Sequence, residues 1–228
     1  HNRIEKITEN VCIPNIRVIY ASHNDLSCIS NSFGNMKHLQ EIHMKNNILE
    51  SFDFVESLTN LHVLDLSHNL LIRSADLSHH CHLLELNLSY NRLTMIPFVR
   101  GVCMFNISRN MIASLVLASG KETTLKIKKE RVLDLDSSQD GEALGVAQQS
   151  VNESRLSVMG NTLTAFNISD NLLKNIDDIY LLHNLQELNA AHNDIMLLNR
   201  KLAKLSKLRV LNLAQNRIQK LPKNLDKL

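Results

Sequence analysis

Residues 61–71 read LHVLDLSHNLL, and this stretch decides the fold of the chain. In it, Leu64 and Leu66 flank the polar residue Asp65, so apolar side chains recur with a period of two, as in a short strand with one buried face. The chain must turn after such a strand, and the amide of Asn69 can pair with backbone groups that the turn leaves without partners. The stretch therefore predicts a strand followed by a turn that a buried Asn holds.

The pattern L-x-x-L-x-L-x-x-N-x-L of this stretch recurs along the chain, with Ile, Met, Val, Phe or Ala sometimes in place of Leu. Other clear copies cover residues 83–93 and 208–218. The Asn positions of neighbouring copies lie 22 or 23 residues apart, except for a step of 19 residues before Asn110 and a gap of 61 residues after it. These residues form a predicted structural ladder of Asn24, Asn47, Asn69, Asn91, Asn110, Asn171, Asn193 and Asn216.

A single repeat of this kind is too small to bury its own leucines. Because a fully buried Leu contributes roughly 1.5–3 kcal/mol, the repeats are expected to stack on one another. Stacking places their strands side by side and parallel. The return segments, such as residues 32–39 and 202–208, have apolar residues at three-residue spacing, which fits a short helix or 3-10 turn.

In these residues the chain resembles the leucine-rich repeat family, whose motif covers nearly all of it outside the gap. The resemblance implies an α/β solenoid: a curved array with a parallel β-sheet on its concave face and short 3-10, helical or irregular segments on its convex face. Repeats of 22–23 residues resemble the shorter members, so we expect a modest right-handed curve with little regular helix outside. Residues 1–228 are predicted to form a single solenoid, a fragment that begins and ends inside repeats.

The pattern degrades between the regular repeats of residues 1–118 and those of residues 163–228, and two interpretations are open for residues 119–162. In the first, degenerate repeats at residues 125–132 and 144–151 fill the gap, with Glu130 and Gln149 in the Asn position. In the second, residues from about 119 to 160 form an insertion, and residues 156–163 form a strand that leads back. The spacing favours degenerate repeats.

One residue in each repeat points outward between the two apolar strand positions. We predict that these residues form a concave binding surface for a partner protein: Tyr20, His43, Asp65, Asn87, Asn106, Asn167, Asn189 and Asn212. Flanking exposed positions add Glu41, Lys45, Glu85, Arg109, Asp170, Glu187 and Arg209. Ordinary solvated sheet residues that pair across repeats are the alternative interpretation, in which case the edges or the convex side would serve for binding.

The composition argues against several other functions. The 25 basic and 23 acidic residues give a net charge of +2 and form no basic stripe, so nucleic acid is not an expected partner. The longest apolar run, residues 111–118, is far shorter than the roughly 18 to 20 residues of a membrane helix, so we expect no membrane insertion in this segment. No phosphate-binding loop or paired nucleophile and base indicates an enzyme, and no cofactor is expected.

Histidine, cysteine and glycosylation motifs are weak signals here. Residues 79–82 read HHCH, but four contiguous side chains cannot converge on one ion, so we expect surface histidines around a partly buried Cys81 and no metal site. Cys12, Cys28 and Cys81 fall in predicted connections and Cys103 in a predicted strand, without the closely spaced clusters of extracellular caps. This favours free thiols and a cytoplasmic location over an extracellular one. Sequons at Asn87, Asn106, Asn152 and Asn167 are about as many as chance provides.

The repeat thus predicts a protein-interaction scaffold, with signalling as its expected setting. Two other interpretations are a targeting or regulatory segment of a larger signalling enzyme and the ectodomain of an extracellular recognition receptor. The motif is specific for fold and nearly silent about function, because its family serves many unrelated partners.

Overall fold

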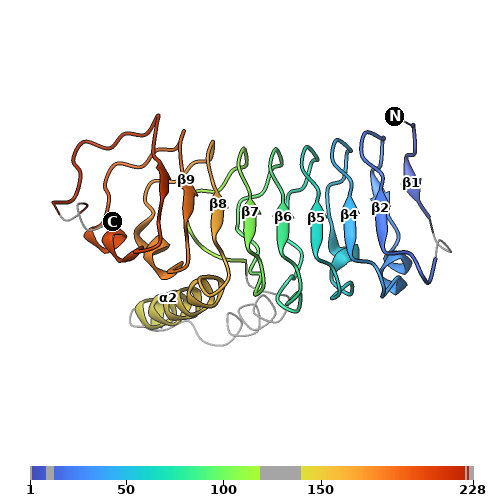
Figure 1. Ribbon diagram of the computed structural model, residues 1–228, viewed down its shortest axis with the longest axis horizontal. Coiled ribbons are helices and arrows are strands. Elements are labelled where there is room, and N and C mark those ends of the chain that lie inside the picture. The colour runs from blue at the N-terminus through green and yellow to red at the C-terminus, as the bar shows by residue number, and fades with distance from the viewer. Residues whose placement is uncertain (1, 9–12, 119–139, 224, 226–228) are drawn as a thin grey trace.

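One long parallel sheet organises the computed structural model, which describes residues 2–8, 13–118, 140–223 and 225 (Figure 1). Its eight strands follow the order β10-β9-β8-β7-β6-β5-β4-β2, and each repeat contributes one strand. This confirms the predicted solenoid with a parallel sheet. The strands are β2 (Val18–Tyr20), β4 (Glu41–His43), β5 (Val63–Asp65), β6 (Glu85–Asn87), β7 (Met104–Asn106), β8 (Ala165–Asn167), β9 (Glu187–Asn189) and β10 (Val210–Asn212).

The return segments hold short helices and a second, smaller sheet. That sheet pairs β1 (Lys6–Ile7) with β3 (Cys28–Ile29) in parallel. The 3-10 helices are η1 (Asn31–Asn35), η2 (Asp53–Val55), η3 (Asp177–Leu181) and η4 (Arg200–Lys204). Within the described residues, no helix is both long and apolar enough to cross a membrane.

The core lies directly behind the sheet and is built from the middle residue of each strand. Leu64, Leu86 and Phe105 are buried and lie opposite one another in register, as the period-two pattern predicts. Phe105 and Phe166 stack with ring centroids 5.4 Å apart. The sheet therefore continues without a break from β7 to β8.

That direct pairing shows that degenerate repeats do not continue the sheet through the gap. Met104 pairs with Ala165, so the sheet has no place for further strands between β7 and β8. Residues 140–159 form the helix α2 (Asp140–Met159), in which the proposed Gln149 repeat and the start of the proposed return strand at residues 156–163 both fall. Both strand predictions are wrong there. The proposed repeat at residues 125–132 lies outside the described residues.

Side-chain amides of the ladder Asn residues join each repeat to the one before it. Asn69 Oδ1 accepts a hydrogen bond from Leu49 N at 3.0 Å, and its Nδ2 donates to Met44 O and Leu66 O, both at 3.0 Å. Asn171 reaches across the gap, because its Oδ1 accepts from Ile112 N at 3.0 Å. The inner ladder residues are buried, so water cannot replace these bonds. The ladder holds the strands on a rigid frame.

Candidate binding face

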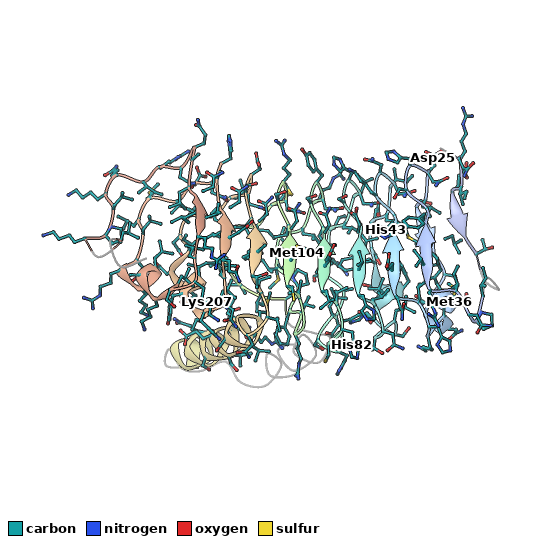
Figure 2. The ribbon with its side chains drawn as sticks, in the orientation of Figure 1. Asp25, Met36, His43, His82, Met104 and Lys207 are labelled. Carbon is teal, nitrogen blue, oxygen red and sulfur yellow. The ribbon has the colours of Figure 1, made fainter. Side chains whose placement is uncertain are left out.

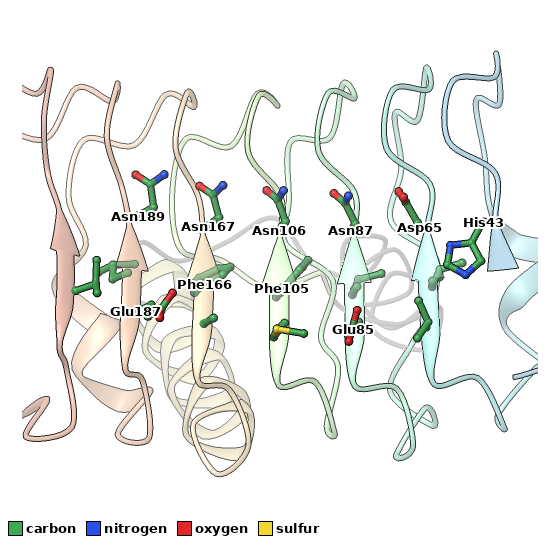
Figure 3. Close-up of a pocket in the computed structure, with 17 residues that line it drawn as sticks. His43, Asp65, Glu85, Asn87, Phe105, Asn106, Phe166, Asn167, Glu187 and Asn189 are labelled. Carbon is green, nitrogen blue, oxygen red and sulfur yellow. The ribbon is translucent and has the colours of Figure 1, made fainter. Parts of the chain in front are cut away.

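A shallow hollow of about 460 Å³ crosses the sheet face from β4 to β10 (Figure 3). Strand residues line it throughout, so its shape follows from the repeat itself. Of the predicted surface residues, Tyr20 and Asn212 lie outside the lining. The lining includes six of the others: His43, Asp65, Asn87, Asn106, Asn167 and Asn189. Figure 2 shows the same face with its side chains, with His43 and Met104 on the strands and His82 beyond the edge where the strands begin.

The Asn residues in the hollow accept hydrogen bonds with the amide oxygen Oδ1 and leave the amide nitrogen Nδ2 facing outward. Asn87 Oδ1 accepts hydrogen bonds from Ser89 N at 3.2 Å and from Ser89 Oγ at 2.8 Å. Asn106 repeats this arrangement with Ser108, and the Oδ1 atoms of Asn167, Asn189 and Asn212 each accept from the backbone N–H two residues on. Because an N–H can donate only to the oxygen, the amide orientation is determined. Within the described residues, no acceptor is bonded to the Nδ2 atoms of this row.

Charge and apolar surface alternate along a second row, formed by the first residue of each strand. Glu85 and Glu187 are exposed, and Met104 between them is 47% exposed. The lining contains no Lys or Arg and no Ser, Thr, Cys or Tyr side chain. The hollow is therefore acidic, and its lining offers no nucleophile beside His43.

At the β2 end of the face, the exposed side chains contact one another. The ring of His43 stacks on Tyr20 with centroids 4.7 Å apart, and His43 Nε2 lies 3.3 Å from Glu41 Oε2. These three side chains satisfy one another, as the alternative interpretation of paired sheet residues expects. In the Asn row farther along, by contrast, the Nδ2 atoms have no bonded acceptor among the described residues.

A stacked row of side chains along the upper edge of the sheet was missed by the sequence reasoning. The residue before each ladder Asn has a positive φ of 52–58°, a left-handed conformation that His, Asn and Asp adopt more readily than most residues. Rings of His68 and Tyr90 stack at 3.9 Å, the Arg109 guanidinium lies 4.8 Å from the centroid of Tyr90, and Arg109 pairs with Asp170 at 3.7 Å. Burial, followed by the charge of Lys45, lowers the pKa of His68. The recurrence of His before the Asn was the signal available.

The histidine run at residues 79–82 is divided between the surface and the core. His80 is fully buried, with its Nε2 3.1 Å from Val55 O and its Nδ1 without a partner, and burial lowers the pKa of His80. Cys81 is exposed. The expectation of surface histidines around a partly buried Cys therefore holds for His79 and His82, which are exposed, but it is wrong for His80, which turns inward, and for Cys81. No group of three candidate metal ligands occurs in the described part of the chain.

Two smaller features lie away from the hollow. Cys28, Cys81 and Cys103 are free, and Cys28 lies in the strand β3 and not in a connection, whereas Cys12 lies outside the described residues. The sequon residue Asn152 is buried in α2. A second hollow, of about 320 Å³, lies at the edge where the strands begin and is lined by Arg17, His38, Gln40, Asn60, His62 and His82.

Comparisons with known proteins agree with this architecture. The Leucine Rich Repeat family profile matches residues 207–228, and no curated protein matches the chain. The functional domain of InlJ from Listeria monocytogenes has a TM-score of 0.65 at 19% identity, over 92% of this chain and 37% of that one. Internalin C2 of Listeria monocytogenes gives 0.69 at 16% identity, over 93% and 77%.

The LRIM1/APL1C complex gives a TM-score of 0.70 at 22% identity, over 96% of this chain and 34% of that one. The chain thus spans about a third of that structure and of InlJ. At these identities the likeness concerns the fold alone. The chain therefore has the fold of a leucine-rich repeat solenoid, and its residues 207–228 match the profile of that family.

Proposed function

We propose that this chain binds a partner protein on its concave sheet face and has no catalytic role of its own. The observation that carries the proposal is the row of outward Nδ2 groups in the 460 Å³ hollow, because hydrogen-bond donors on a rigid frame suit recognition of another chain. The lining has no nucleophile beside a base, which argues against catalysis. The similar LRIM1/APL1C structure is itself a complex of proteins.

A pair of matched methionine variants tests the proposal. Met104 lies in the hollow and is 47% exposed, whereas Met111 is 51% exposed and lies outside the lining. Both changes to Arg add the same bulk and charge at half-exposed sites, so both folds should survive. We expect Met104→Arg to capture at least about 10-fold less of a partner protein from the source tissue than the unchanged chain does. Met111→Arg should capture as much as the unchanged chain. Equal retention by both variants would move the binding site off this face.

A further inference from the structure

Along the row formed by the first residue of each strand, the hollow is acidic at two places and apolar between them. Asp65, the third carboxylate of the lining, lies in the neighbouring row and accepts a hydrogen bond from Ser67 N. Glu85 in β6 and Glu187 in β9 occupy the same strand position, and Met104 in β7 and Ala165 in β8 occupy that position between them (Figure 3). Among the described residues, neither carboxylate forms an ion pair, and no Lys or Arg lines the hollow. A ligand with two positive charges around an apolar group would complement this row.

The spacing of the strands limits how far apart those charges lie. Glu85 and Glu187 are three strand steps apart, and since neighbouring strands lie about 4.8 Å apart, the two positions are separated by about 14 Å. An extended peptide rises about 3.4 Å per residue, and its side chains alternate between two faces. Residues four apart therefore share a face and span about 14 Å. The residue midway between them would lie over Met104 and Ala165.

The neighbouring Asn row suits the backbone of the same peptide. Carbonyl groups of an extended chain point sideways, and those on one side recur every two residues, or about 7 Å. Carbonyls four residues apart would then face Asn87 and Asn189, and the carbonyl between them would face Asn106 and Asn167. The outward Nδ2 groups of this row are hydrogen-bond donors, as this contact requires.

We propose that the hollow binds an extended segment of a partner protein that crosses the strands, with basic residues four positions apart and an apolar residue midway. The basic side chains pair with Glu85 and Glu187, the apolar side chain covers Met104 and Ala165, and the Asn row binds the backbone. This inference rests on the proposed function, because it specifies the partner chemistry of the same face.

Synthetic peptides test the spacing directly. The probe is a labelled nine-residue peptide with blocked ends, lysines at its third and seventh positions, leucine at its fifth and serine elsewhere. The 228-residue chain, produced in bacteria so that the sequons carry no glycan, should bind this probe at least about 5-fold more tightly by fluorescence anisotropy than a peptide with lysines three positions apart. Replacement of the leucine by serine should also weaken binding. Equal binding of all three peptides, or equally tight binding of spermine, would overturn the proposal.

Charge variants locate the contact. The double variant Glu85→Gln with Glu187→Gln should weaken binding of the probe by about 10-fold, whereas Glu41→Gln should leave it unchanged. Glu41 is a matched control because it holds the same strand position in β4 but is already paired with His43 and lies outside the lining. An unchanged affinity in the double variant would contradict the proposed contact.

Competition separates this inference from the function on which it rests. Excess probe should displace the partner that Met104→Arg releases. A partner that Met104→Arg releases but the probe does not displace would leave the binding face in place and overturn its proposed chemistry. A partner that neither affects would overturn both.

Discussion

The regular repeats and the segment between β7 and β8 both pair backbone groups with side-chain amides, but in the segment a helix supplies one of these amides. In the repeats, the turn after each strand is bonded by an Asn of the next repeat, as Leu49 N is by Asn69 Oδ1. At the gap, Asn171 bonds Ile112 N in the same way, and farther along the segment Leu117 N donates to Asn152 Oδ1 at 2.9 Å while Asn152 Nδ2 donates to Leu115 O at 3.0 Å. Asn152 comes from the helix α2 and from no repeat motif. Buried backbone groups outside the ladder thus also need side-chain partners, and a helix can supply them as well as a repeat can.

The largest expected effect is the loss of a ladder amide inside the regular repeats. Asn69→Ala leaves the buried Leu49 N without its partner and removes one of the two side-chain donors to each of Met44 O and Leu66 O, so the free energy of unfolding should fall by about 3 kcal/mol. Urea denaturation measures this loss. Asn60→Ala is the control, because the amide of Asn60 makes its bond to Lys37 O at an exposed site and should matter little. Similar losses in both variants would mean that burial of the ladder is unimportant.

Loss of the amide that α2 supplies should have a smaller and local effect. Asn152→Ala leaves Leu117 N and Leu115 O without their partner, but the sheet pairing of β7 with β8 remains. We expect about 1–2 kcal/mol of destabilisation. Hydrogen exchange should become faster at Leu117 while the strand amides stay protected. A loss of protection through the whole sheet would show that α2 is part of the cooperative array.

Acid should weaken the regular repeats through His80. Burial lowers the pKa of His80 in the folded chain below its unfolded value, so the unfolded chain binds the proton more readily and stability falls as pH drops below about 6.5. The slope contributed by this group is at most about 1.4 kcal/mol per pH unit. Thermal melts of wild type and His80→Gln between pH 7.5 and 5 measure it. An identical pH dependence in both chains would exclude His80 as the cause.

The contact between α2 and η3 should respond to acid in the opposite direction, with the smallest effect. Burial, followed by the charges of Glu153 and Asp177, raises the pKa of Asp178. Because the fold disfavours the charged form, this contact should strengthen slightly as pH falls through the raised pKa. Asp178→Asn should slow hydrogen exchange in α2 at pH 7 and abolish the pH response. Faster exchange in this variant would mean that the carboxylate is favourable.

The sequence predicted the regular half of the architecture well because each repeat contains the residues that determine its own strand and turn. Leu64 and Leu66 specify a strand face, and Asn69 specifies the turn, without reference to distant residues. The Asn positions of the predicted surface followed from the same register, although their binding role stays a prediction. The same local reasoning failed at residues 144–151. These residues resemble the motif only weakly, and the direct pairing of β7 with β8 cannot be inferred from them.

By itself the sequence determined the repeat, its register and the row of residues that faces outward, because alternation and spacing are local properties of the chain. Only the tertiary structure decided which of the exposed side chains already have partners within the chain. Stacking brings Tyr20 against His43 and Tyr90 against His68, so these side chains satisfy one another. It also leaves Glu85 and Glu187 without counter-charges among the described residues, at a separation set by the strands between them. Such distances depend on which strands are neighbours, and the order of strands across a gap is not encoded in any one repeat.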